Sequence, residues 1–252
     1  MSGNGRLAGR VALVTGGSRG LGRGIAEGFG AEGAKVIVNY VKDAESANAV
    51  VKQIEKAGSE ALAVRANVGL VEDVKKMVEE GLKRFGKIDI LVNNAGLLNF
   101  GPLAEMSVET WDEMIQTHLR GMFLCTRFVI PQMLKNKYGK VINVSGTFGV
   151  LGGENFTHLS AAKAGMIGFT QALAKEVGRH GINVNVIAPA MIRTDLYKFM
   201  PEADREAIVS TYPLRRVGEV EDVVSTAMFL ATKDSSFFTG QTLCPAGGDV
   251  MV

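Results

Sequence analysis

The sequence predicts an α/β fold in a single domain: a doubly wound parallel sheet of seven strands with helices on both faces. Segments typical of strands and segments with helical periodicity alternate along the whole chain, which is typical of a parallel sheet covered by helices. The strand-like segments are almost continuously apolar, as strands buried on both faces are. No linker, charge block or internal repeat divides the 252 residues, so we expect one domain over residues 1–252.

The elements follow one another in a regular order. The expected strands are short apolar runs at Val11–Val14, Lys35–Tyr40, Ala61–Val64, Ile88–Val92, Val141–Val144, Val184–Ile187 and Gln241–Cys244. Helical periodicity fills the intervals at Leu21–Glu32, Asp43–Ala57, Val71–Phe85, Ser107–Leu134, Glu154–Gly178 and Val220–Thr232. Residues 194–217 depart from the alternation and predict a helical flap between the sixth strand and the last helix. Arginines at the edges of this flap can hold an anionic substrate, unless they are solvated: Arg193, Arg215 and Arg216.

Composition and charge exclude several classes of protein. An apolar fraction of 46% is too high for a disordered chain, and no run of about 18 apolar residues offers a membrane-spanning helix. The net charge of +2 is dispersed, so neither nucleic acid nor membrane is expected as a partner. Cys125 and Cys244 stand far apart, which favours a reducing, cytoplasmic setting. The three histidines lack metal-ligand spacing, so no metal site is expected.

A glycine-rich loop follows the first expected strand and opens the first helix. It reads Thr15-Gly16-Gly17-Ser18-Arg19-Gly20-Leu21-Gly22. Glycine permits a tight turn and a close approach of the backbone to a pyrophosphate, and the helix N-terminus offers free N–H groups. A loop in this position predicts a dinucleotide site, the alternative being only a tight turn between strand and helix.

The spacing Gly16-x-x-x-Gly20-x-Gly22 resembles that of the short-chain dehydrogenase/reductase family. Further motifs of this family follow over nearly the whole chain: Asn93-Asn94-Ala95-Gly96 after the fourth strand, Pro189 with Thr194 after the sixth, and Gly240, Gly247 and Gly248 near the last. The resemblance implies a Rossmann-type fold, usually assembled as a tetramer, with NAD or NADP as cofactor. It implies cofactor contacts at Gly16, Ser18, Arg19, Gly20, Leu21, Gly22, Asn39, Asn67, Asn94, Ala95, Gly96, Lys163, Pro189 and Thr194.

The choice between NAD and NADP stays open. The second strand ends Val38-Asn39-Tyr40 without the acid that binds a ribose 2′-OH in NAD sites. Arg19 can pair with a 2′-phosphate, or it can be a solvated loop charge, and Asn39 can hydrogen-bond a ribose. Asn67 stands where the family usually has an aspartate near the adenine, so an acceptor is kept and a charge is lost.

The catalytic centre that the resemblance implies is degenerate. The family uses a Tyr and a Lys four residues apart on one helix, a Ser thirteen residues before the Tyr, and an Asn that holds a relay water. The segment Ser160-Ala161-Ala162-Lys163 resembles the surroundings of the family's Lys, so Lys163 is retained. The other three positions hold Leu159, Gly146 and His118. Leucine cannot donate a proton, and the loss of a positioned acid and its partner leaves little acid–base catalysis.

Three functions follow from this pattern. The leading hypothesis is a catalytically inactive (pseudoenzyme) subunit of a hetero-tetrameric short-chain alcohol dehydrogenase, whose active homologous subunit oxidises a hydroxyacyl substrate such as a CoA ester. The family includes such paired subunits. The first alternative is an NAD(P)-dependent 3-oxoacyl or ketone reductase with a substitute acid. The second is a non-redox enzyme that uses His118 or His158 as a base near pH 7, although His118 can equally fill the hole left by the Asn.

Overall fold

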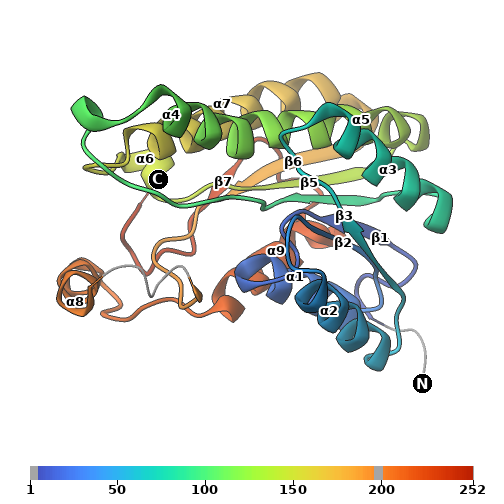
Figure 1. Ribbon diagram of the computed structural model, residues 1–252. Helices are drawn as coiled ribbons and strands as arrows, with labels where there is room; N and C mark the ends of the chain where they lie inside the picture. The colour runs from blue at the N-terminus through green and yellow to red at the C-terminus, as the bar shows by residue number, and fades with distance from the viewer. Residues whose placement is uncertain (1–4, 196–200, 252) are drawn as a thin grey trace.

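The computed structural model describes residues 5–195 and 201–251, and it confirms the predicted fold class (Figure 1). Seven parallel strands form one sheet in the order β3-β2-β1-β4-β5-β6-β7. The strands are β1 Val11–Val14, β2 Lys35–Tyr40, β3 Ala61–Arg65, β4 Ile90–Asn93, β5 Gly139–Val144, β6 Ile182–Ile187 and β7 Thr242–Leu243. β1 lies in the middle of the sheet, between β2 and β4.

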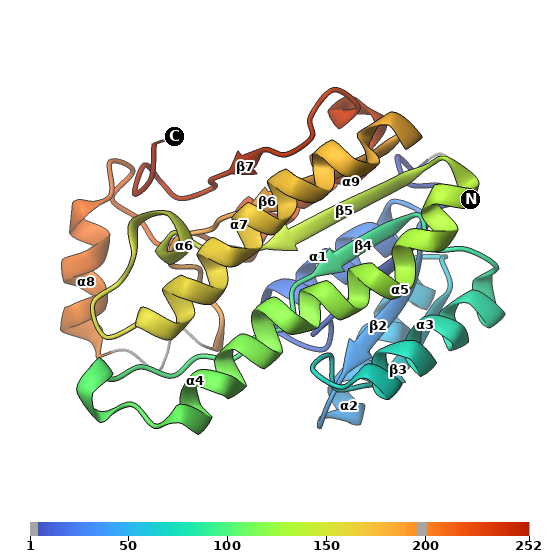
Figure 2. The ribbon, with the colours of Figure 1, turned by 90° about the horizontal axis from the view of Figure 1, so that it is seen from above.

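Two layers of helices cover the sheet (Figures 1 and 2). One layer holds α1 (Gly20–Ala31), α2 (Ala44–Lys56) and α9 (Val220–Ala231); the other holds α3 (Val71–Phe85), α4 (Val108–Ile115), α5 (Gly121–Asn136) and α7 (Thr157–Val177). Alternate residues of β1 belong to the two cores. Val14 packs in the cluster that contains Phe29 of α1, and Leu13 packs in the cluster that contains Met77 of α3. Both faces of the strand are therefore buried, which explains why its sequence is apolar at every position.

The long helix expected over Ser107–Leu134 differs most from the structure. It is divided into α4, a π-helical turn over Gln116–Arg120, and α5. Wide π turns inside α-helices are frequent at functional sites. The other long helix, α7, begins at Thr157 rather than Glu154, because a short helix, α6 (Phe148–Leu151), precedes it.

The segment after β6 carries α8, Glu202–Thr211, and residues 196–200 of the predicted flap lie outside the described residues. A parallel bridge between Ile192 and Gly218 joins the two ends of the segment. The flap therefore leaves and rejoins the domain at one place.

Two ion pairs hold the base of the flap to the N-terminus of α9. Arg193 lies 2.9 Å from Glu219, and Arg216 lies 2.6 Å from Asp222. Glu219 and Asp222 also form the capping box of α9. The structure thus gives Arg193 and Arg216 contacts that anchor the flap, and the anionic-substrate contact that the sequence allowed stays a prediction.

Candidate functional site

The carboxyl ends of β1 and β4 mark the place where the strand order reverses. β1 pairs with β2 on one side and with β4 on the other. Loops that leave such strands diverge, and ligands of open α/β sheets bind in the crevice between them. The glycine-rich loop follows β1 and residues 94–96 follow β4, so the fold brings both predicted motifs to this crevice.

Three positions of the glycine-rich loop require glycine. Gly16 and Gly20 have φ values of 61° and 54°, a region that glycine occupies readily. A Cβ on Gly22 would lie 2.2 Å from the carbonyl oxygen of Gly16 and 2.5 Å from Nδ2 of Asn94. The N-cap residue of α1, Arg19, makes no side-chain bond to the helix, so the N–H groups of the first turn can face phosphate oxygens. The residues present therefore fit the pyrophosphate of a dinucleotide.

Two asparagines brace this loop from inside the protein. Nδ2 of Asn94 donates to the carbonyl oxygens of Thr15 and Gly16 at 2.9 and 3.2 Å. Asn39 is 0% exposed; its Oδ1 accepts from the N–H of Gly16 at 3.1 Å, and its Nδ2 donates to the carbonyl oxygen of Ala66 at 2.9 Å. This placement beneath the loop corrects the ribose contact that the sequence suggested for Asn39.

The predicted adenine end of the site carries an exposed positive charge. Arg19 is exposed, and its cation contributes to the lowered pKa of Asp43, whose main cause is the hydrogen bonds from Ser46. Asn67 is also exposed, and its Oδ1 accepts from the N–H of Gly69 at 3.0 Å. Ser18 and Leu21 of the loop are half-buried. Both Arg19 and Asn67 are thus accessible to a ligand.

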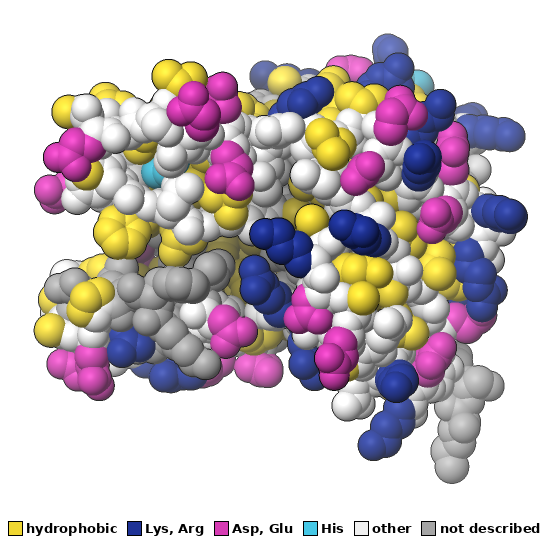
Figure 3. Space-filling view, viewed as in Figure 1, with side chains coloured by type: hydrophobic (Ala, Val, Ile, Leu, Met, Phe, Trp, Pro, Cys, Tyr) yellow, Lys and Arg dark blue, Asp and Glu magenta, His cyan; other side chains and the backbone are white. Residues whose placement is uncertain are grey.

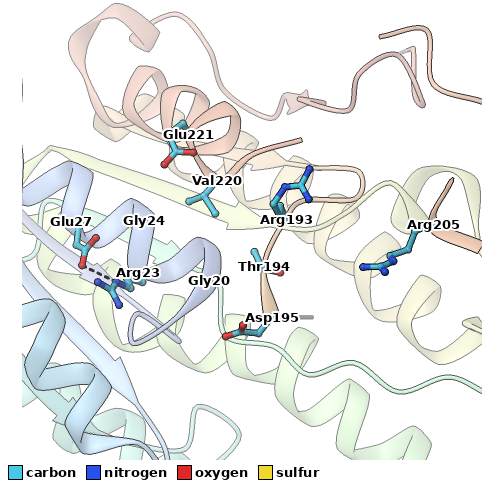
Figure 4. Close-up of a pocket in the computed structure, with 10 residues that line it drawn as sticks. All are labelled: Gly20, Arg23, Gly24, Glu27, Arg193, Thr194, Asp195, Arg205, Val220 and Glu221. Atoms are coloured by element: carbon cyan, nitrogen blue, oxygen red, sulfur yellow. Dashed lines mark hydrogen bonds and ion pairs between the residues drawn. The ribbon is translucent and has the colours of Figure 1, made fainter. Parts of the chain in front are cut away.

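A cavity of about 620 Å³ opens between α1 and the segment after β6 (Figure 4). Figure 4 shows Arg23 and Glu27 paired on α1, with Arg205 of α8 on the opposite side. A Cβ on Gly20 would lie 3.6 Å from Cγ2 of Thr194, so two predicted cofactor contacts meet at this wall. The lining residues are Gly20, Arg23, Gly24, Glu27, Arg193, Thr194, Asp195, Arg205, Val220 and Glu221.

Lys163 of α7 lies against the end of β5. Its Nζ donates to the carbonyl oxygen of Val144 at 2.8 Å, and burial lowers the pKa of the amine to about 7. A Cβ on Gly146 would meet the carbonyl oxygen of Pro189 at 3.7 Å, an ordinary van der Waals contact. The amine is kept, and Gly146 adds no side chain after β5.

Leu159 lies one turn before Lys163 in an apolar cluster. It is 6% exposed and packs with Met114 and Ala162. The rings of Phe148 and Phe156, with centroids 4.8 Å apart, pack against this cluster. Hydrocarbon groups therefore surround the position where the family places its proton-transferring phenol.

His118 fills the centre of the π turn and is 4% exposed. Its ring lies over Gly96, where a Cβ would be 2.4 Å from Cε1. Nε2 lies 2.9 Å from the carbonyl oxygen of Leu97. Burial, helped by the Lys163 cation, lowers the pKa of His118 to about 3. Such an imidazole is neutral at pH 7 and is a weak base there, which disfavours His118 as a general base.

His158 is also a buried structural residue. It is 0% exposed, its Nε2 bonds to Oδ1 of Asn99, and burial lowers its pKa. Sequence reasoning missed Asn99, because this residue belongs to no motif and stands 59 positions away. His118 and His158 are therefore both held by the loop that follows β4.

The buried His118 predicts a specific loss of stability in acid. Its pKa is about 3 when folded and about 6.5 when unfolded, so the unfolded chain takes up the proton first as pH falls below 6.5. We expect unfolding free energy to fall by about 2–3 kcal/mol from this residue between pH 7 and pH 4.5. Denaturant titrations should show that His118→Asn removes this part of the slope. If the unfolding free energy of the variant depended on pH as that of the native chain does, the role given to His118 would be wrong. The difference in unfolding free energy between the two chains at pH 8 is the internal reference.

The hydroxyl groups of Ser145 and Tyr212 have partners within the protein. Ser145, next to Gly146, is 4% exposed, and its Oγ donates to the carbonyl oxygen of Lys163 at 2.9 Å. The hydroxyl of Tyr212 is 3.4 Å from the N–H of Met191, and burial raises its pKa. A phenol with a raised pKa holds its proton more tightly, so Tyr212 is a poor substitute acid.

Residues 5–195 and 201–251 contain no group of three or more His, Cys, Asp or Glu side chains placed to hold a metal ion. In the same residues, no helix combines the length and hydropathy needed to cross a membrane.

Comparison with known proteins gives a consistent result. The family model for short chain dehydrogenase matches residues 10–205. A 3-oxoacyl-[acyl-carrier-protein] reductase of Synechocystis is 43% identical over 97% of this chain and 98% of its own. The (2S)-[(R)-hydroxy(phenyl)methyl]succinyl-CoA dehydrogenase subunit BbsD of Thauera aromatica is 42% identical over 95% and 96%. A crystal structure of a putative short-chain alcohol dehydrogenase from Sinorhizobium meliloti matches with a TM-score of 0.93 and 33% identity over 96% and 97%.

Proposed function

Because the chain belongs to the short-chain dehydrogenase family, we propose that it is a redox-inactive subunit that assembles with an active homologous subunit of the same family. NAD or NADP, bound by the glycine-rich loop, Asn94 and Thr194, supplies hydride transfer in members that have the complete catalytic centre. In this chain the proposed nucleotide site keeps these residues but has no proton donor at position 159.

The environment of Leu159 is the observation that carries the proposal. Reduction or oxidation at a carbonyl carbon requires a proton to be exchanged with the substrate oxygen, and a positioned acid contributes about 10²–10⁴-fold to the rate. At position 159 this acid is replaced by a leucine packed among Met114, Phe148 and Phe156. Gly146 supplies no hydroxyl to orient the substrate. The hydroxyl of Ser145 donates its hydrogen bond to the backbone carbonyl oxygen of Lys163.

The nature of the proposed complex follows from its relatives. One relative is named as a subunit of (2S)-[(R)-hydroxy(phenyl)methyl]succinyl-CoA dehydrogenase, and the word subunit indicates an enzyme built from more than one chain. We assign this chain the inactive position in a dehydrogenase of that kind, with the active subunit oxidising a hydroxyacyl-CoA ester. Such a complex is a hetero-tetramer in this proposal.

The outer surface of the long helices supports a helical partner. Figure 2 shows α5 and α7 running side by side on one face of the molecule. Ala161, Ala164 and Ala172 of α7 are exposed, as is Phe123 of α5 at 46%. Small exposed side chains allow the backbone of a second helix to approach closely. Gly165 of α7 faces the π turn, because an added Cβ would lie 3.0 Å from Cδ2 of Leu119.

Isolation from the native cell tests the assembly. We expect the tagged chain to co-purify with a homologous subunit whose sequence carries Ser, Tyr and Asn at the positions of Gly146, Leu159 and His118. Native mass spectrometry of the purified complex should show both chains in a fixed ratio. Recovery of a homo-oligomer alone, at native expression level, would contradict the proposal.

The intact nucleotide loop favours a second candidate, a 3-oxoacyl reductase with a substitute acid. Three similar relatives, from Synechocystis and Staphylococcus, are named 3-oxoacyl-[acyl-carrier-protein] reductases. This candidate requires the purified chain alone to oxidise NADPH or NADH in the presence of a 3-oxoacyl thioester. Under the leading proposal no such turnover occurs until the homologous subunit is added, so one spectrophotometric assay separates the two candidates.

A further inference from the structure

A second cavity, of about 450 Å³, lies where the two ends of the flap meet the segment that follows β7. Its three walls are residues 190–192, residues 212–218 and residues 244–248. Apart from Asp222 of α9, every described residue that lines the cavity belongs to one of these walls. The loops after β1, β4 and β5 take no part in this lining, so the cavity is separate from the nucleotide site and from Lys163.

The walls of this cavity are joined to one another. The N–H of Leu214 donates to the carbonyl oxygen of Gly247 at 3.0 Å. A Cβ on Gly248 would lie 2.5 Å from Cγ of Pro213, so the end of the flap packs closely against the segment after β7. The cavity is therefore a preformed hollow at a firm junction, and its volume lies within the range of roughly 300–1,000 Å³ that is usual for small-molecule sites.

The cavity is mostly apolar and reaches the surface. Tyr212 and Ala246 are 3% and 2% exposed and lie at its depth, whereas Leu214 is 62% exposed and lies at its mouth. Met191 and Pro245 add further hydrocarbon to the lining. Figure 3 shows the molecule hollowed between α8 and the layer of α4 and α6, with hydrophobic side chains along the upper side of the hollow.

The phenol of Tyr212 brings an unused hydrogen-bond donor to the cavity. Its oxygen accepts from the N–H of Met191 at 3.4 Å, and its own O–H meets no acceptor within residues 5–195 and 201–251. Burial, together with the Asp249 carboxylate, raises the pKa of Tyr212, so the phenol keeps this proton at neutral pH. A buried donor without an acceptor is costly, and a ligand that supplies the acceptor removes that cost.

The charges around the cavity favour a neutral ligand. Two hydrogen bonds, at 2.6 and 2.9 Å, pair the guanidinium of Arg216 with the carboxylate of Asp222. The carboxylate of Asp249 lies near enough to act on the phenol of Tyr212. Two of these three charges are negative, and the positive one is already paired. An anionic ligand would therefore be repelled, whereas a neutral oxygen acceptor would not.

We propose that this cavity binds a small neutral molecule with an apolar body and one carbonyl oxygen, which accepts the hydrogen bond of Tyr212. The apolar body replaces water against Met191, Leu214 and Pro245. The inference goes beyond the proposed redox-inactive role and does not depend on an assembled complex. A molecule held in this cavity contacts both ends of the flap and the segment after β7, so it also stabilises the folded chain.

Protection of Cys244 from alkylation tests the proposal on the full chain. Cys244 lines the cavity and is half-buried, whereas Cys125 is 0% exposed and should stay unmodified while the chain is folded. The probe is cyclohexanone, titrated during reaction with iodoacetamide in mildly alkaline buffer, because burial raises the pKa of the Cys244 thiol. Peptide mass spectrometry should show the rate at Cys244 falling to a plateau, while the melting temperature rises.

A matched pair of variants tests the hydrogen bond. Tyr212→Phe removes only the phenol oxygen, and should raise the cyclohexanone concentration for half-protection by about 2- to 10-fold. Tyr138→Phe is the control, because this half-buried phenol also has a pKa raised by burial but lies under the guanidinium of Arg10, 3.8 Å from the ring centroid. It should leave the half-protection concentration unchanged.

A charged analogue tests the preference for a neutral ligand on the native chain, and it serves if Tyr212→Phe fails to fold. Cyclohexanecarboxylate carries an oxygen acceptor on the same ring, and should need a concentration on the order of tenfold higher for half-protection. The proposal is overturned by no protection of Cys244 with cyclohexanone, by equal affinities of the native chain and Tyr212→Phe, or by equal protection from the carboxylate. Because the readout is alkylation of one peptide, it is independent of whether a partner subunit is found.

Discussion

Turnover of the proposed hetero-oligomeric dehydrogenase is expected to fall by about 10²–10⁴-fold when the homologous partner's tyrosine, at the position of Leu159, is replaced by phenylalanine. The substitution His118→Asn in this chain should leave the rate of that complex unchanged. The reason is that Leu159 lies in an apolar cluster and His118 is held neutral, so the proposal assigns the proton transfer to the partner. Initial rates of nucleotide reduction with the hydroxyacyl-CoA substrate measure both effects.

The opposite pattern would refute the assignment of an inactive role. If the complex kept its rate without the partner's tyrosine and lost it with His118→Asn, this chain would carry its own chemistry. Co-purification of both chains at the native ratio is the control in each variant, because a lost subunit would mimic a lost catalytic group.

The second large effect is expected at Gly22. A Cβ there would lie 2.2 Å from the carbonyl oxygen of Gly16 and 2.5 Å from Nδ2 of Asn94. Both the backbone at Gly16 and the side chain of Asn94 would therefore have to move. We expect Gly22→Ala to lower the unfolding free energy by about 3 kcal/mol, which is the upper end of the usual cost of overpacking. The melting temperature should fall by about 6–12 °C. Any NAD or NADP binding by the isolated chain, measured by calorimetry, should be lost with it.

Gly168→Ala is the matched control. Gly168 also lies within a helix, α7, but a Cβ there would meet nothing within 4 Å. This substitution should raise the unfolding free energy by about 0.5–1 kcal/mol, because alanine restricts the unfolded chain and favours helix. A similar destabilisation by both substitutions would show that the crowding at Gly22 does not explain its requirement for glycine.

The nucleotide loop could be predicted because its signals are local. Gly16, Gly20 and Gly22 stand at fixed spacing directly after an apolar strand, and the structure shows the turn and the contact that require them. Leu159 and Lys163 share a helix face by their spacing alone. A pattern of this kind is readable without knowing what packs against it.

Other parts of the site depend on contacts between distant residues, and sequence spacing carries no signal for them. Asn39 reaches Gly16 and Ala66, which stand 23 and 27 positions away. The π turn divides the expected long helix at His118, whose ring packs over Gly96, 22 positions earlier in the chain. Arg193 and Arg216 form ion pairs with acidic residues at the start of α9, and the sequence did not predict these pairs.

By itself the sequence determined the fold class, the order of strands and helices, and the nucleotide loop. The physical reason is that hydrophobic periodicity and residue chemistry are properties of the chain. Only the tertiary structure decided the charge and access of the groups that remain. Burial keeps His118 neutral and lowers the pKa of Lys163, and Leu159 packs in an apolar cluster with Met114. Protonation depends on desolvation and on nearby charges, which exist only once distant segments have been brought together.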